Sequence, residues 1–229
     1  MEAGGGRYTP LRPGRHRLPR EFIVNSQRDR ILDAIAEECL AKRYEAVSVA
    51  DVVGRARVSR STFYELFKDK EDCFLAAYDA ILGKFMSTAM VAYRTPGLEW
   101  RRRIRGAVEA ILAFLAAEPA FAWMCIVEAP AAGPRAVERY MSAVVLLASL
   151  LDEGRAEAEA GESIPASVPS ALVGGLAMVV HGEIVNGRTE ALPSIAPDFV
   201  YAVLVPFLGR DAALREANAT AAAAGSRRV

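Results

Sequence analysis

Apolar residues recur at three- and four-residue steps along most of this chain, which is the spacing of one face of an α-helix. The pattern begins clearly at Ile31, Leu32 and Ile35, and proline or glycine interrupts it at intervals. No segment shows the strict alternation of apolar and polar residues that is typical of a strand. The sequence therefore predicts an all-α protein, whose longer helices after the first are expected at residues 70–94, 99–117, 119–129, 134–160, 168–188 and 195–209.

Helix starts are marked by a side-chain acceptor followed three residues later by a carboxylate, an arrangement that resembles a capping box. It occurs three times within 45 residues, at Ser26, Ser48 and Asp69. Two short helices are expected between the second and third marks, at residues 49–56 and 60–67, with Ser59 as a further N-cap. A short helix, a three-residue turn and a second short helix form the outline of a helix-turn-helix.

The second short helix has two chemically different faces. Its apolar side chains, together with those of the helix before it, can pin the pair against the first helix; these are Val52, Val53, Val58, Phe63 and Phe67. Arg60, Ser61, Tyr64 and Glu65 are left near the opposite face. A B-DNA major groove, about 12 Å wide, admits such a helix, and an arginine can donate two hydrogen bonds to a guanine. Arg60 as a solvated charge is the alternative, and the role of Glu65 stays open.

The stretch from Ser48 to Phe74 resembles the tetracycline-repressor (TetR/AcrR) family, and the resemblance covers about residues 26–80. Its most specific part is Val58-Ser59-x-x-Thr62-Phe63-Tyr64-x-x-Phe67, followed by Lys70-Glu71. The resemblance implies an N-terminal three-helix DNA-binding domain and a larger helical domain that binds a ligand and dimerises. In the family, the positions of Thr62, Tyr64 and Lys70 contact phosphate.

The expected DNA-contacting residues combine this resemblance with the chemistry of the side chains. Hydroxyl groups and backbone N–H groups at a helix N-terminus suit an anion. The set is Ser48, Arg57, Ser59, Arg60, Ser61, Thr62, Tyr64 and Lys70. Arg43 and Arg57 depart from the family, because glycine commonly ends the first and second helices at these positions. A left-handed backbone there costs a non-glycine residue roughly 1 kcal/mol.

Charge is distributed unevenly although the net charge is zero. Residues 1–70 contain 14 Lys and Arg against 10 Asp and Glu, and the excess of four reverses in the remainder. A basic front end favours a polyanionic partner. We expect a flexible basic arm at residues 1–24, the helix-turn-helix domain at 25–70, an effector-binding and dimerisation domain at 71–210, and a tail at 211–229. The arginines of the arm can enter a minor groove or belong to a solubilising tail.

Helix 195–209 has two adjacent apolar stripes, one with Val203 and Phe207 and the other with Val200, Leu204 and Leu208. One stripe can face the core of the subunit, so the other is expected to face a partner. The resemblance implies a homodimer through residues near 168–188 and 195–209. A dimer with two-fold symmetry would place two recognition helices on a palindromic double-stranded operator.

A small hydrophobic effector is what the resemblance implies for the middle of the second domain. The candidate lining residues are Phe114, Phe121, Trp123, Met124, Tyr140, Met141, Met178 and His181. Ordinary core packing is the alternative for each of them. Glu128 ends an apolar helix, where it can answer a cationic ligand or simply lie exposed.

Enzymatic and metal sites are not expected. The chain has two histidines and three widely spaced cysteines, and it lacks phosphate-binding, nucleophile-elbow and dinucleotide motifs. We therefore predict no catalytic residue, no metal and no cofactor. The longest apolar runs are short of the roughly 20 residues that span a bilayer, so a cytoplasmic protein is expected. The favoured function is a homodimeric repressor released from its operator by a small hydrophobic ligand; the alternative is a DNA-binding regulator whose second domain only dimerises.

Overall fold

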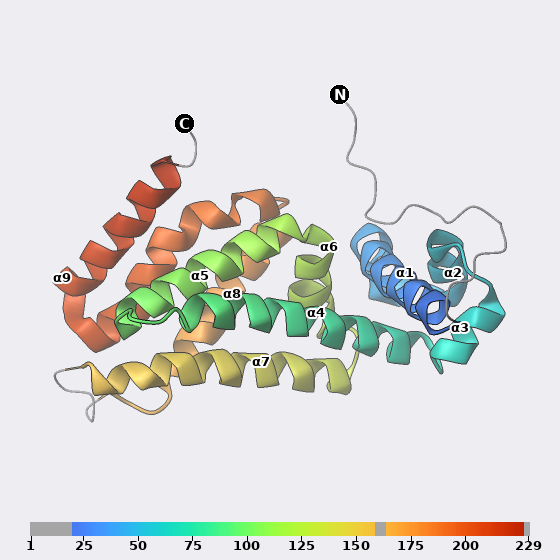
Figure 1. Cartoon of the computed structure of the whole chain (residues 1–229), viewed down its shortest axis with the longest axis horizontal. Helices are drawn as coiled ribbons and strands as arrows, with labels where there is room; N and C mark the ends of the chain where they lie inside the picture. Colours follow the sequence, from blue (N-terminus) through green and yellow to red (C-terminus); the bar gives the residue numbers. More distant parts are fainter. Residues whose placement is uncertain (1–19, 159–163, 227–229) are drawn as a thin grey trace.

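Helices form the whole framework of the described chain (Figure 1). The computed structural model describes residues 20–158 and 164–226, and no strand occurs in these two ranges. The predicted all-α fold class is confirmed. Residues 1–19 of the predicted arm lie outside the described residues.

Three helices form the N-terminal domain. They are α1 (Arg20–Lys42), α2 (Val49–Ala56) and α3 (Arg60–Leu66), and a single 3₁₀ turn, η1 (Tyr44–Ala46), lies between α1 and α2. Ile31 and Ile35 of α1 are fully buried, as is Phe63 of α3. The two short helices therefore pack on α1 through the apolar side chains that their sequence places inward.

The first helix begins earlier than its sequence pattern suggests. α1 starts at Arg20, whereas a start at Ser26 was predicted, so the end of the predicted arm is helical. The added turns are mostly exposed, with Phe22 at 54% and Ile23 at 41%. Because a helical turn on the surface needs no apolar periodicity, the hydrophobic pattern contains no signal for it. Glu21 lies in the first turn, where a carboxylate interacts favourably with the helix dipole.

Within the described ranges, six further helices form the body. α4 (Lys70–Tyr93) lies along α5 and also contacts α1 and α7, so it extends from the N-terminal domain far into the body (Figure 1). The short α6 continues into one π-helical turn, η2 (Trp123–Glu128), and 3₁₀ segments follow α7 and precede α9. The remaining elements are α5 (Trp100–Ala117), α6 (Pro119–Ala122), α7 (Pro134–Asp152), η3 (Glu153–Ala156), α8 (Val168–Val185), η5 (Thr189–Ile195) and α9 (Ala196–Ser226).

Residues 211–226, for which the sequence allows a tail or a fraying helix, are helical. α9 bends sharply at Gly209, whose φ of 73° and ψ of 172° are not helical, and then continues to Ser226. The segment after the bend packs on α5 (Figure 1): Ala213 and Ala217 are buried, and Glu216 accepts a hydrogen bond from Arg105 at 2.8 Å. The sequence gives little indication of a packed helix here, because the apolar residues of the buried face are alanines, and alanines also occur on the exposed face.

Four of the five residues in the two apolar stripes of α9 are buried inside one chain, and Leu208 is half-buried. Val200, Val203, Leu204 and Phe207 are each at most 4% exposed. The expectation that one stripe faces a partner is therefore wrong. Residues of both stripes belong to one buried cluster, because α9 lies deep in the body rather than on its surface.

An uncovered apolar surface is found on α8 instead. Met178 is 65% exposed, Val179 48% and Val185 50%. By length and mean hydropathy α8, α4 and the run 189–222 could each cross a membrane, contrary to the sequence expectation, and only 17% of the α8 window is buried. α8 is thus an apolar helix that its own chain covers on one side only.

Candidate nucleic-acid interface and apolar cavity

Both short helices begin at side-chain caps. Ser48 Oγ accepts a hydrogen bond from the backbone N–H of Asp51 at 3.3 Å, and Asp51 Oδ2 accepts from the N–H of Ser48 at 2.9 Å. Ser59 Oγ accepts from the N–H of Thr62 at 3.0 Å. These caps satisfy N–H groups that lack a partner within the helix. They fix where α2 and α3 start and therefore the angle between them.

The turn between α2 and α3 contains a residue with a left-handed backbone, as expected at a position where glycine is common in the family. Arg57 has φ 53° and ψ 49°, and its N–H donates to Gly54 O at 3.3 Å. Val58 N–H donates to Val53 O at 3.1 Å, which closes the turn. The Arg57 side chain is exposed beside the start of α3.

One face of α3 is anchored and the other faces solvent. Phe63 is fully buried and its ring lies 5.7 Å from that of Phe67, which is 3% exposed. Arg60, Ser61 and Tyr64 are exposed, Tyr64 at 55%. These three side chains therefore lie where the sequence predicted them, on the exposed face of a short capped helix.

Lys70 makes contacts within the protein that the sequence did not predict. Its Nζ donates to the backbone carbonyls of Tyr44 and Val47, both at 2.9 Å, and lies 4.3 Å from the centre of the Tyr44 ring. The cation therefore binds two carbonyl groups of the connection that follows α1. It ties the start of α4 to the connection between α1 and α2.

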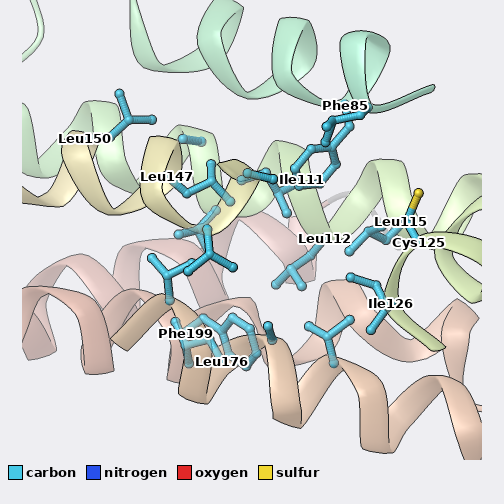
Figure 2. A pocket seen from close by; sticks show the side chains of 18 of the residues that line it. Phe85, Ile111, Leu112, Leu115, Cys125, Ile126, Leu147, Leu150, Leu176 and Phe199 are labelled. Atoms are coloured by element: carbon cyan, nitrogen blue, oxygen red, sulfur yellow. The ribbon is translucent and has the colours of Figure 1, made fainter. Parts of the chain in front are cut away.

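A cavity of about 150 Å³ lies in the body. Helices α4 to α9 and the turn η2 all contribute to its walls, and Figure 2 shows side chains from several of these elements converging on one space. Phe85, Leu112, Leu147, Leu176 and Phe199 are among them. The lining residues include no Asp, Glu, Lys, Arg or His. Burial raises the pKa of Tyr78, Tyr140 and Cys125, which also line the cavity, so all three are neutral near pH 7.

Two of the eight predicted ligand residues, Phe121 and Tyr140, line this cavity. Phe114 lies behind the wall, with its ring 6.0 Å from Phe85 and 5.4 Å from Phe121. Met124 is fully buried without lining the cavity.

The other four predicted ligand residues do not line the cavity either. Trp123 directs its indole N–H to Glu128, and His181 is half-buried outside the lining. Met141 is 50% and Met178 65% exposed on the outer surface. The missed lining residues are mainly leucine, isoleucine, valine and alanine, and in the sequence these look like any other core residue.

Glu128 is neither exposed nor directed at a ligand. It is 1% exposed and accepts hydrogen bonds from the N–H of Tyr44 at 3.0 Å and from Trp123 Nε1 at 2.9 Å. Arg43 completes its surroundings with an ion pair of 3.0 Å. Within the described ranges no three His, Cys, Asp or Glu side chains come together as they would around a metal ion.

Comparison with known proteins gives the N-terminal region a family. Residues 31–77, from within α1 to within α4, match the family model of bacterial regulatory proteins of the tetR family. Over 100 residues the chain is 31% identical to the HTH-type transcriptional activator FasR of Mycolicibacterium smegmatis. This match covers 44% of the chain and 43% of that protein, so the chain spans less than half of this relative's length.

Solved structures extend the likeness to the body. The fatty acid degradation regulator FadR of Bacillus halodurans has a TM-score of 0.70 at 19% identity, covering 78% of this chain and 94% of that one. FadR of Bacillus subtilis, solved in complex with stearoyl-CoA, has a TM-score of 0.68 at 17% identity, covering 79% and 98%. At such identities the likeness describes the fold.

The capped helix pair and the cavity-containing helical body define a regulator of the helix-turn-helix class. Within that class, the N-terminal region at residues 31–77 matches the tetR family of bacterial regulatory proteins.

Proposed function

We propose that the protein is a cytoplasmic homodimeric repressor that binds a palindromic operator and is released from it by a small, mostly apolar molecule. One observation carries the proposal. The exposed Arg60–Tyr64 face of α3 and an uncharged cavity occur in the same chain, and α4 contributes to the cavity and contacts the N-terminal domain.

The surface of α3 supports a role in binding the major groove. Arg60 can donate to guanine O6 and N7, and the neighbouring Ser61 can donate to or accept from a base edge. Tyr64 and Arg57 are exposed on either side of them and suit phosphate contacts. Ser48, Ser59 and Thr62 are engaged in helix caps, so we assign them to phosphate binding through the ends of the helices they begin.

Binding to an operator selected from random duplexes tests the DNA-binding surface. Arg60→Ala should weaken operator binding by about 1–3 kcal/mol and relax the preference at one base pair. Tyr64→Phe should weaken specific and random duplexes alike, because a phosphate contact carries no sequence information. Equal losses for Arg60→Ala on both kinds of duplex would reassign Arg60 to phosphate, and unchanged binding in both variants would refute the surface.

An acyl chain is the effector that the walls of the cavity favour. They offer carbon and neutral groups only, so a charged head group has no partner there and must stay outside the apolar part. The structure of Bacillus subtilis FadR contains stearoyl-CoA, which supplies a defined probe. We therefore propose a long-chain acyl thioester or a related apolar chain as the effector class.

A side chain that fills the cavity tests this assignment. Ala107 on α5 is buried and lines the cavity, whereas Ala113 on the same helix is exposed and does not. Ala107→Phe should raise the stearoyl-CoA concentration needed for release at least about tenfold, a cost near 1.4 kcal/mol. Ala113→Phe should behave like the original protein. A reporter gene under the operator then gives the sign of regulation, since the curated relative is an activator.

The size of the cavity supports one alternative function. A volume of about 150 Å³ is below the roughly 300 Å³ at which small-molecule pockets usually begin. A body that only dimerises would need no larger space. If neither stearoyl-CoA nor shorter acyl-CoA molecules bind or change operator affinity, this alternative replaces the effector proposal.

A further inference from the structure

A buried carboxylate joins the two parts of the molecule. Glu128 ends the π-helical turn η2 and is 1% exposed. Its Oε2 accepts from the Tyr44 N–H at 3.0 Å, and its Oε1 accepts from Trp123 Nε1 at 2.9 Å and pairs with Arg43 Nε at 3.0 Å. Two of the three donors belong to the connection between α1 and α2, and the third belongs to η2 itself. A buried charge requires such partners, and the loss of one leaves an uncompensated carboxylate.

The backbone at Arg43 is unfavourable for any residue with a side chain. Its φ of 70° and ψ of 145° lie outside the regions that non-glycine residues normally adopt. The guanidinium group lies over the Trp123 ring, 5.6 Å from its centre, while its Nε faces Glu128. Arg43 therefore has a strained backbone, while Glu128 binds its charge and the Trp123 ring packs against its guanidinium group.

η2 also forms part of the cavity wall. Cys125 and Ile126 line the cavity (Figure 2), and Glu128 follows them in the same six-residue turn. π-helical turns interrupt regular helix geometry and are frequent at functional sites. A ligand that displaces Cys125 or Ile126 must move or deform this turn, and the carboxylate moves with it.

On the other side of Glu128, the connection between α1 and α2 is a junction. The Tyr44 ring packs against Phe74 of α4, with ring centres 4.8 Å apart, and Lys70 binds the carbonyls of Tyr44 and Val47. Ser48, the cap of α2, follows Val47 directly. A shift of Tyr44 therefore reaches the start of α2 and, through the turn at Arg57, the recognition helix α3.

We propose that Glu128 is the positioning residue that transmits occupancy of the cavity to the helix-turn-helix, through Arg43 and the backbone of Tyr44. This inference rests on the proposed function, because it needs an effector in the cavity. α4 offers a second route, since Tyr78, Leu82 and Phe85 line the cavity on the helix that Lys70 begins. The test must separate the route through Glu128 from the route through α4.

The experiment uses full-length dimer, a selected operator duplex and stearoyl-CoA. For each protein three quantities are measured: affinity for stearoyl-CoA without DNA, affinity for operator without stearoyl-CoA, and the ratio of operator affinities without and with it. Glu128→Gln removes the charge. Arg43→Gly removes the guanidinium and supplies the residue that the backbone angles favour, and Arg43→Lys restores a cation. Asp79→Asn is the matched control, since Asp79 pairs with Arg139 at 2.6 Å within the body.

The expected result is a loss of coupling without a loss of binding. Glu128→Gln and Arg43→Gly should bind stearoyl-CoA and operator separately within about threefold of the original protein, while the ratio falls at least about tenfold, within the usual range of coupling between sites. Arg43→Lys should recover part of the ratio, and Asp79→Asn should leave it unchanged. A purely structural role would change stability and leave the ratio intact.

Two outcomes overturn the inference and are distinguishable. If the original protein responds to stearoyl-CoA and both variants respond equally, the Glu128 route fails and the proposed function stands. If the original protein binds operator but does not respond to any acyl-CoA, the effector part of the proposed function fails, and the inference fails with it. Circular dichroism of each variant establishes that it is folded, and Arg43→Gly provides the test if Glu128→Gln is not.

Discussion

In residues 20–69 polar side chains mark the ends of short helices, whereas in residues 70–226 long helices are distinguished mainly by the apolar faces they pack together. Ser48, Ser59 and Asp69 each cap a helix through the N–H group three residues later. The cavity is instead enclosed by side chains from seven elements, many of them distant from one another in the sequence. The features of the first region are therefore visible in its local sequence, whereas the cavity of the second region forms only when its helices pack.

This difference has a physical basis. An exposed arginine or tyrosine on a capped helix has few structural reasons to be there, so its presence indicates a binding surface. A leucine that lines a cavity and a leucine that fills the core satisfy the same requirement for burial. Nothing in the chain itself distinguishes them, and only the packing of the helices decides which side chains leave a space between them.

The largest expected effect concerns the uncovered face of α8. Met178→Arg should leave the chain folded, because Met178 is 65% exposed, but should place an unpaired charge in a dimer interface formed by this face. Loss of the dimer removes the avidity of two linked modules and should weaken operator binding by about 10²- to 10⁴-fold. Sedimentation reports the mass and a gel shift reports the affinity.

The control for this prediction is Ala113→Arg, which places the same charge on an exposed position of α5. It should remain a dimer. If Met178→Arg also remains a dimer, the interface lies elsewhere, with the exposed Met141 and Val145 of α7 as the next surface to test. A monomeric original protein at micromolar concentration would refute the two-groove mode of binding.

A smaller effect is expected from packing at the far end of the body. A Cβ on Gly154 would lie 2.3 Å from Trp100 Cζ2, and the Trp100 indole donates to Leu150 O at 2.9 Å. Gly154→Ala should therefore lower the free energy of unfolding by about 1–3 kcal/mol. Chemical denaturation measures it. Gly83→Ala in α4 meets no atom within 4 Å and should instead stabilise the helix by about 0.5–1 kcal/mol; a loss as large as that of Gly154→Ala would contradict the packing argument.

Lys70→Ala should affect stability more than a surface phosphate contact would. Its two hydrogen bonds to carbonyls connect α4 to the α1–α2 connection, and their loss should cost about 1–2 kcal/mol, with Lys70 partly exposed. Lys68→Ala, two residues earlier and exposed, should change stability by less than about 0.5 kcal/mol. Equal stability of the two variants in urea would return Lys70 to the set of phosphate contacts.

Lys70 and the two α9 stripes show what sequence inference leaves out. The sequence predicted the short helices within a residue, because their caps and turn are encoded by neighbouring residues. It did not reveal that Lys70 binds the carbonyls of Tyr44 and Val47, because these groups are brought to the start of α4 by folding. It misassigned the stripes, because periodicity gives the width of an apolar surface but not the element that covers it. The burial of Glu128 was not predicted for the same reason: two of its three donors are 84 or more residues away in the sequence.

The smallest expected effect is at Arg57, where backbone and side chain make separate contributions. Its left-handed conformation, with φ 53° and ψ 49°, costs a non-glycine residue about 1 kcal/mol or more. Glycine removes this cost, but it also raises the entropy of the unfolded chain, which offsets part of the stabilisation. Arg57→Gly should therefore raise the free energy of unfolding by about 0.5 kcal/mol. If the exposed guanidinium meets a phosphate, the same change should lower the salt dependence of DNA binding by about one counterion. Arg57→Lys keeps both the strain and the charge, so it should match the original protein in both measurements. If Arg57→Gly is more stable and its DNA binding has an unchanged salt dependence, Arg57 does not contact DNA. Neither backbone conformation nor electrostatics would then explain an arginine at this turn.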